Sequence, residues 1–166
     1  MYLTTKIKKG LHVMCIVALM AFGGCSVKHD IMLSSPYLIT LKTPEMAFSD
    51  AGFLNQANNY TQLQIFSAGT AILNLEMQER ICLDGVCLDA LDFNKRFFGT
   101  EHYATLLHDL VHKKPLYEGR GYTKTDTGFS QNILLKNALI TYTVEGDMRY
   151  FKEAKHGILI RLRPLL

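Results

Sequence analysis

Residues 63–75, with the sequence LQIFSAGTAILNL, decide the class of fold. Apolar and polar residues alternate on both sides of a Ser-Ala-Gly turn, with Leu63 and Ile65 before the turn and Leu73 and Leu75 after it. A period of two is typical of β-strands, and a strand with one apolar face belongs to a sheet that covers a core on one side and meets water on the other. The stretch therefore predicts two neighbouring strands of an antiparallel sheet.

Alternation of this kind extends along the chain in both directions. Met77, Ile81 and Leu83 continue the apolar face, and Gln78 and Arg80 continue the polar one. Alternating stretches bounded by turn residues predict further strands at residues 37–42, 47–54, 129–135, 140–144, 148–151 and 158–162. The body of the chain is therefore expected to be mostly antiparallel sheet.

Between the two groups of strands, the apolar spacing becomes helical. Apolar residues within 91–98 predict a short helix that Gly99 ends, and a second helix is predicted over residues 101–112 with Thr100 as its cap. The apolar residues of the second helix share one face: Tyr103, Leu106, Leu107, Leu110 and Val111. The order of strands, helices and strands predicts an α+β domain in which the helices lie on an apolar surface.

Two cysteines flank the clearest turn signal in the chain. Residues 81–88 read ICLDGVCL, and Asp-Gly is a strong signal for a two-residue hairpin turn. With that turn, Cys82 and Cys87 face each other in a non-hydrogen-bonded pair, where the Cβ atoms are closest. In an oxidising compartment we expect a disulfide. The alternatives are a reduced pair or half of a metal site, although two cysteines supply only two ligands.

The start of the chain resembles the leader of a bacterial lipoprotein. Lys6, Lys8 and Lys9 precede an apolar run of about 11 residues, which is shorter than the roughly 20 that a membrane-spanning helix requires. The run ends in Phe-Gly-Gly before Cys25, which is similar to the site where lipoproteins are cleaved and acylated. The alternatives are an ordinary signal peptide or a buried first helix.

This leader predicts the division and the location of the chain. Residues 1–24 are expected to be a signal peptide, residues 25–35 a lipidated tether and residues 36–166 a single domain. Ser26 follows the lipidated cysteine, where by enterobacterial sorting rules an aspartate favours retention in the inner membrane. We therefore expect a protein anchored by lipid on Cys25, in the outer membrane and facing the periplasm.

The charge of the expected mature chain is balanced. Residues 1–24 hold three of the 18 Lys and Arg residues and none of the 15 Asp and Glu residues, which leaves 15 of each sign. A neutral domain lacks the basic surface that binding to nucleic acid requires. The sequence therefore predicts no nucleic-acid partner, and it assigns attachment to the membrane to the acyl chains.

One short motif imitates a catalytic metal site. His108-Asp109-Leu110-Val111-His112 is similar to the zincin pattern, with Asp in place of the Glu that acts as base. The helical spacing places both histidines away from the apolar stripe, so a solvated face is the expected interpretation. The acids near the helices, Asp89, Asp92 and Glu101, are expected to favour helix N-termini rather than to form a catalytic pair. We therefore predict no enzyme, metal or cofactor.

The pattern as a whole resembles the LolA/LolB family of periplasmic lipoprotein carriers and outer-membrane lipoprotein receptors. The resemblance lies in residues 63–75, with their glycine-containing turn between strands, followed by the Asp-Gly hairpin, the helix at 101–112 and the Pro115-Leu116 exit. It implies an incomplete antiparallel β-barrel, or half-barrel, in which a central helical insertion covers the apolar face. It also implies an interior that accepts the acyl chains of lipoproteins from a periplasmic carrier protein.

The same resemblance suggests which residues form the site. Acyl chains are expected against Leu63, Ile65, Leu73, Leu75, Met77, Leu106, Leu110, Ile140, Tyr142 and Val144. The turn that enters the membrane in the family corresponds to Ala68, which is small, and Phe66 is the nearest large apolar residue. The expected function is delivery of lipoproteins to the outer membrane. The alternative is a non-enzymatic assembly lipoprotein whose core is filled and whose surface binds an envelope protein.

Overall fold

The computed structural model describes residues 32–165, so the expected signal peptide at 1–24 and the lipidation site Cys25 lie outside the described residues. The described residues fall in one compact unit, Ile31–Leu166. They form eleven strands: β1 (Leu33–Lys42), β2 (Ala47–Ala57), β3 (Tyr60–Ser67), β4 (Thr70–Met77), β5 (Ile81–Leu83), β6 (Val86–Leu88), β7 (Tyr122–Lys124), β8 (Gly128–Leu134), β9 (Leu139–Glu145), β10 (Met148–Glu153) and β11 (Ile158–Pro164). Between β6 and β7 lie the helices α2 (Ala90–Phe98) and α3 (Leu106–Val111) and a single 3₁₀ turn, η1 (Tyr117–Gly119).

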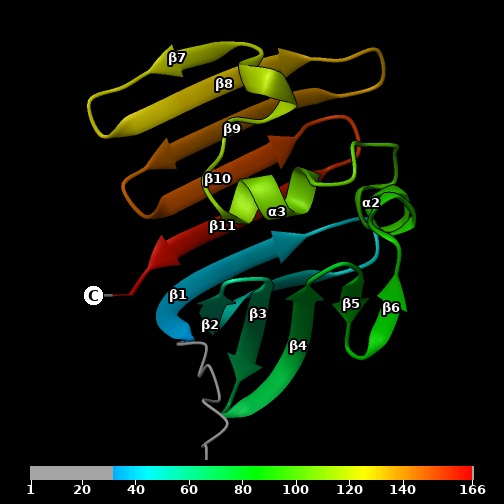
Figure 1. The fold of residues 1–166 in the computed structure, drawn as a ribbon, viewed down its shortest axis with the longest axis vertical. Coiled ribbons are helices and arrows are strands. Elements are labelled where there is room, and N and C mark those ends of the chain that lie inside the picture. The colour runs from blue at the N-terminus through cyan, green and yellow to red at the C-terminus, as the bar shows by residue number, and fades with distance from the viewer. Residues whose placement is uncertain (1–31, 166) are drawn as a thin grey trace, which may run out of the picture. The chain divides into compact units, whose positions relative to one another are not determined.

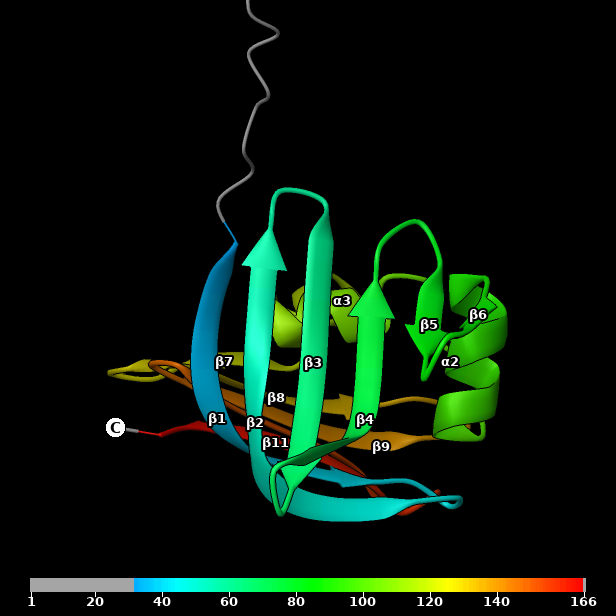
Figure 2. The same ribbon diagram turned by 90° about the horizontal axis from the view of Figure 1, so that it is seen from below.

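All eleven strands belong to one open sheet, in the order β6-β5-β4-β3-β2-β1-β11-β10-β9-β8-β7. Every neighbouring pair is antiparallel, which confirms the expected antiparallel sheet, and one open sheet of this kind is consistent with an open, barrel-like fold. Two runs of consecutive hairpins meet where β1 pairs with β11, so that blue and red strands lie side by side (Figure 1). The sheet curves strongly, as the bent β1 and β2 show (Figure 2).

The alternation in residues 63–75 sets the register of β3 and β4 as predicted. Leu63 pairs with Leu75 and Ile65 with Leu73, and all four side chains are buried. The turn between the strands consists of Ala68 and Gly69, both with positive φ, as in the two-residue turns that match the twist of a hairpin. The register shifts by one residue after Ile65, which marks a β-bulge.

A glycine allows β2 to lie close to its neighbours. A Cβ atom on Gly52 would stand 2.1 Å from the Gln64 carbonyl oxygen of β3 and 2.5 Å from the Ile39 side chain of β1. Strand glycines often mark such close approaches of the backbone. The packing of β1, β2 and β3 at this point therefore requires a residue without a side chain.

The prediction for the first helix is confirmed, and that for the second is wrong about its start. Helix α2 ends at Gly99 in the left-handed conformation, the usual helix stop. Helix α3 begins at Leu106 rather than at residue 101, with Thr105 as its cap. The reason is the buried Asn94, whose amide donates to the carbonyls of Tyr103 and Ala104. These bonds hold the preceding segment in a non-helical path.

Several strand boundaries also differ from those expected. Strand β1 begins at Leu33, three residues before the expected domain start, and β2 continues to Ala57, so the turn to β3 is confined to Asn58 and Asn59. Strand β7, at Tyr122–Lys124, was not expected, since all three of its side chains are exposed and carry no apolar alternation. One buried core contains apolar residues of both the sheet and the helices.

Candidate functional site

The ten residues expected to contact acyl chains lie together in the core between the sheet and α3. Their exposed fractions are between 0 and 5%, and all belong to one apolar cluster. Leu106 and Leu110 of α3 face the strands, and Ile140, Tyr142 and Val144 of β9 are among the sheet residues beneath the helices. In this conformation the interior is therefore occupied by the protein's own side chains.

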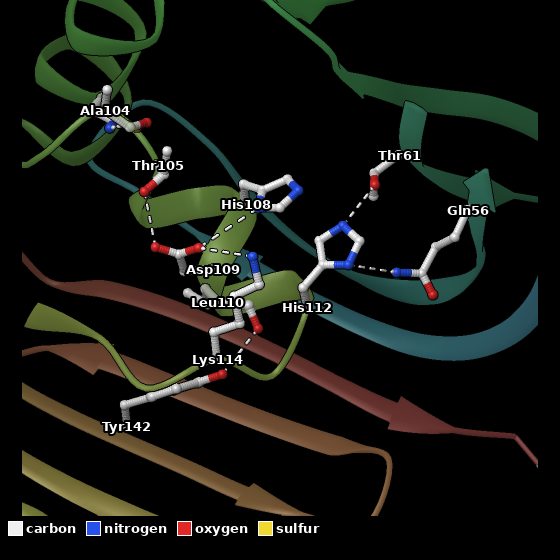
Figure 3. Close-up of polar contacts among 11 residues, drawn as sticks. Gln56, Thr61, Ala104, Thr105, His108, Asp109, Leu110, His112, Lys114 and Tyr142 are labelled. Carbon is white, nitrogen blue, oxygen red and sulfur yellow. Dashed lines mark hydrogen bonds and ion pairs between the residues drawn. The ribbon is translucent and has the colours of Figure 1, made fainter. Parts of the chain in front are cut away.

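The C-terminal end of α3 is bound to the sheet through its backbone. The Tyr142 hydroxyl of β9 donates to the Leu110 carbonyl at 3.0 Å (Figure 3). The Arg149 guanidinium of β10 donates through Nε to the Val111 carbonyl at 2.9 Å. The last carbonyls of a helix have no partner within the helix, and a cation is favourable there. Both bonds must break before α3 can leave the sheet.

Arg149 is a buried cation with an exposed fraction of 2%. Beyond its bond to α3, it donates to the Tyr37 hydroxyl of β1 and to the Asp147 carbonyl, both at 2.7 Å. Its guanidinium also lies 5.2 Å from the centre of the Tyr37 ring, within the range of a cation–π contact. A buried charge is tolerated when its donors are satisfied, so Arg149 links α3, β1 and β10 at one point.

His112 connects α3 to the other half of the sheet. Its Nε2 lies 2.8 Å from the Thr61 hydroxyl of β3, and its Nδ1 lies 3.3 Å from the Gln56 side-chain nitrogen of β2 (Figure 3). Burial lowers the pKa of His112 to about 4, and the nearby His108 and Lys114 contribute. The ring is therefore neutral at pH 7, with Nδ1 accepting from Gln56 and Nε2 donating to Thr61. The expectation that His112 lies on a solvated face is wrong.

The zincin-like pattern is used for packing. The His108 ring stacks on the His112 ring with centroids 4.1 Å apart, and Asp109 accepts from the Thr105 hydroxyl at 2.9 Å. Among residues 32–165, no group of three side chains is placed to hold a metal ion. The acids near the helices form ion pairs with basic residues and not a pair of carboxylates, since Asp89 pairs with Arg80 and Glu101 with Lys95.

A buried amide holds the segment that follows α3. The Gln131 side chain of β8 accepts from the Leu116 backbone nitrogen at 2.8 Å and donates to the Leu116 and Arg120 carbonyls at 2.9 and 2.8 Å. Sequence analysis missed both Gln131 and Arg149. The alternation along the strands could have indicated both residues, because Gln131 lies on the same buried face of β8 as Phe129, and Arg149 lies on the same buried face of β10 as Phe151. A polar residue at an inward position requires a partner.

A cleft of about 660 Å³ lies at the end of the sheet where the β2–β3 and β4–β5 turns meet α3. We call it the rim cleft. Its lining comprises Ala57, Asn58, Asn59, Tyr60, Thr61, Glu76, Met77, Gln78, Glu79, Arg80, Cys82, Cys87, His108 and His112. Apart from Ala57, Met77 and the two cysteines, these residues are polar or charged. The rim cleft therefore differs in chemistry from the apolar interior next to it.

The predicted disulfide is confirmed. Cys82 and Cys87 face each other across β5 and β6 in the expected register and are bonded through their sulfur atoms, with Cα atoms 3.9 Å apart. The turn between them is Asp84-Gly85, both with positive φ. The bridge forms part of one wall of the rim cleft.

The turn expected to touch the membrane has small residues at its tip. Ala68 is exposed at the β3–β4 turn, whereas the Phe66 ring packs edge-to-face on the Phe53 ring, with centroids 5.8 Å apart. Phe53 is 41% exposed and Ile72 of β4 is 36% exposed. The large apolar side chains near this turn therefore lie behind its tip.

Comparisons with known proteins add no family to this description. No protein-family model matches the chain, and no curated protein matches it. Within the described part of the chain, none of the helices has the length and hydrophobicity needed to cross a bilayer.

Proposed function

We propose that this protein is a lipid-anchored envelope lipoprotein that binds the acyl chains of other lipoproteins and delivers them to the outer membrane. The observation that carries the proposal is the interior between the sheet and α3. It is lined by the ten apolar residues named above, and a six-residue helix lies over it. The curved open sheet and the helical segment between its two halves agree with the architecture of the LolA/LolB family, which the sequence resembles.

Binding of an acyl chain requires α3 to move, since its own leucines occupy the interior. Opening breaks the hydrogen bonds from Tyr142, Arg149 and His112. The net cost is about 1 kcal/mol for each of the two neutral bonds and about 1.5–3 kcal/mol for the charged bond from Arg149. An acyl chain gains about 0.8 kcal/mol for each methylene removed from water. A single long chain therefore offsets the loss of these hydrogen bonds.

The anchor places the domain close to the membrane. If Cys25 carries the lipid, Leu33, where β1 begins, lies eight residues after it along the chain, and a stretch of this length reaches at most about 28 Å. A periplasmic carrier protein is the proposed donor of cargo, and Phe66 and Ala68 are the proposed contacts of the β3–β4 turn with the membrane. The proposal includes no catalytic step, metal or cofactor.

The proposal is tested by depleting the protein from its own cells and separating inner from outer membranes on a density gradient. We expect other lipoproteins to accumulate in the inner membrane, and a copy of the gene to restore their distribution. Normal distribution in depleted cells would contradict the delivery function. Mass spectrometry of the mature protein tests the anchor, because an unmodified Cys25 would remove that part of the proposal.

The second candidate is an assembly lipoprotein that binds an envelope protein through its surface. The observation in its favour is that side chains fill the interior. The two candidates differ in one measurement, which is lipid binding by the purified mature protein. Retention of a triacylated lipopeptide favours the carrier, whereas failure to bind it, together with a crosslinked protein partner, favours the assembly role.

A further inference from the structure

The rim cleft begins where the apolar interior ends. Met77, which is 3% exposed, belongs to the core cluster and also lines the cleft, and Thr61 and His112 lie at the same boundary. When α3 moves away from the sheet, the Thr61–His112 contact opens and this boundary opens with it. A ligand whose tail lies in the interior and whose head is polar would therefore pass from one environment to the other here.

The walls of the rim cleft carry excess negative charge. The cleft is lined by two carboxylates, of Glu76 and Glu79, and one cation, Arg80. Arg80 is already engaged, because its Nε lies 3.5 Å from the Asp89 carboxylate and its Nη2 donates to the Cys87 carbonyl at 2.7 Å. The remaining lining includes amides, hydroxyls and imidazoles, of which the Thr61 hydroxyl and the His112 ring are bonded to each other. Neutral donors and acceptors of this kind can hydrogen-bond the backbone of an extended peptide, and the two carboxylates favour cationic side chains.

The rim cleft lies at the end of the sheet where the chain enters β1. Leu33 pairs with Gln56, one residue before Ala57 in the cleft wall. The beginning of β1 and the β2–β3 turn lie at the same end of the sheet (Figure 2). With lipid on Cys25, the stretch from Cys25 to Leu33 keeps this end within about 28 Å of the membrane.

We propose that the rim cleft binds the polar head of the cargo, which is the peptide that follows the lipidated cysteine, and that Glu76 and Glu79 give it a preference for cationic heads. This inference rests on the proposed function, since it assigns the head of the same cargo whose acyl chains enter the interior. Acyl chains supply the affinity that all lipoproteins share, and the rim cleft distinguishes among them by the charge of the first residues.

The test compares two triacylated lipopeptides that differ only in the head, Cys-Ser-(Lys)4 and Cys-Ser-(Glu)4. Each carries a fluorophore and is titrated against the mature lipid-anchored protein in dodecyl maltoside, an uncharged detergent that competes equally with both. We expect the Lys probe to bind about five- to tenfold more tightly. The Glu76→Gln/Glu79→Gln variant should reduce this ratio to near one, and Gln at position 76 can still accept the hydrogen bond from Asn74.

The matched control is Glu45→Gln/Glu145→Gln, which removes the same charge at two exposed positions outside the rim cleft. It should leave the ratio unchanged. Equal affinity for the two probes in the unmodified protein, or equal effects of the two double variants, would overturn the inference while leaving acyl binding intact. If neither probe binds, the proposed function itself fails.

Discussion

Replacing Tyr142 with phenylalanine tests whether α3 opens separately from the sheet. The side chain is fully buried, and the substitution removes a single hydroxyl, which donates to the Leu110 carbonyl at 3.0 Å. Burial raises the pKa of Tyr142, so this hydroxyl is a donor throughout the physiological range. The Leu110 carbonyl keeps a second, longer bond from the Lys113 nitrogen. We therefore expect the substitution to lower the free energy needed to open α3 by about 1 kcal/mol, near the middle of the range for neutral hydrogen bonds.

Native-state hydrogen exchange measures this loss residue by residue. In the unmodified protein, amides of α3, such as that of His112 bonded to the His108 carbonyl, should exchange faster than those of the central strands β1 and β11, because local openings need less free energy than global unfolding. In Tyr142→Phe we expect α3 amides to exchange about fivefold faster, the factor that 1 kcal/mol gives. A triacylated lipopeptide should bind up to about fivefold more tightly, since the open state becomes easier to reach.

The matched control is Tyr150→Phe, which removes the same hydroxyl from the next strand at a half-buried position near Arg161. It should leave the exchange of α3 unchanged. If α3 amides exchange with the same free energy as the central strands in both the unmodified protein and Tyr142→Phe, α3 has no independent opening. The proposed route for acyl chains into the interior would then be wrong.

Three further predictions concern stability, each measured by urea unfolding. The pKa of His112 is lowered to about 4 from 6.5, so the unfolded chain binds more protons than the folded one between these pH values. The free energy of unfolding should therefore fall by about 1–2 kcal/mol as the pH falls through this window. If His112→Gln shows the same pH dependence of stability as the unmodified protein, the assignment is contradicted. Arg149→Met should lower the free energy of unfolding by about 2–4 kcal/mol, because the loss of the arginine's hydrogen bonds outweighs the gain from removing a buried charge. An unchanged free energy of unfolding would show that Arg149 links α3, β1 and β10 only weakly. Cys82→Ser/Cys87→Ser should cost at most about 2 kcal/mol, since the closed loop is short; global unfolding would show a larger role.

The sheet was largely predictable because its strands are amphipathic. Leu63, Ile65, Leu73 and Leu75 alternate with residues that meet water, and a one-residue slip would expose all four. The disulfide was predictable for a similar reason, since the Asp-Gly turn fixes which residues face each other. In both cases a local pattern determines the geometry.

The start of α3 and the polar links of the interior were not predictable in this way. Asn94 holds the carbonyls before α3 from another helix, so a partner nine or ten residues earlier overrides the local helical spacing in residues 101–105. Likewise, Arg149 and His112 find their partners on strands more than 50 residues away, Tyr37 and Thr61. A polar residue at a buried position is expected to have hydrogen-bond partners, but only the tertiary structure identifies them.

The pairing of β1 with β11 has a consequence for how the protein folds. Each half of the sheet consists of hairpins between neighbours in sequence, which close short loops and form quickly. The seam between the halves joins Tyr37 to Pro164, almost the full length of the described chain. Contacts between residues so far apart in sequence form slowly, because closing a long loop costs conformational entropy. A chain that emerges N-terminus first would therefore assemble β1–β6 while β1 still presents an unpaired edge, and the domain would become complete only when its last strand arrives.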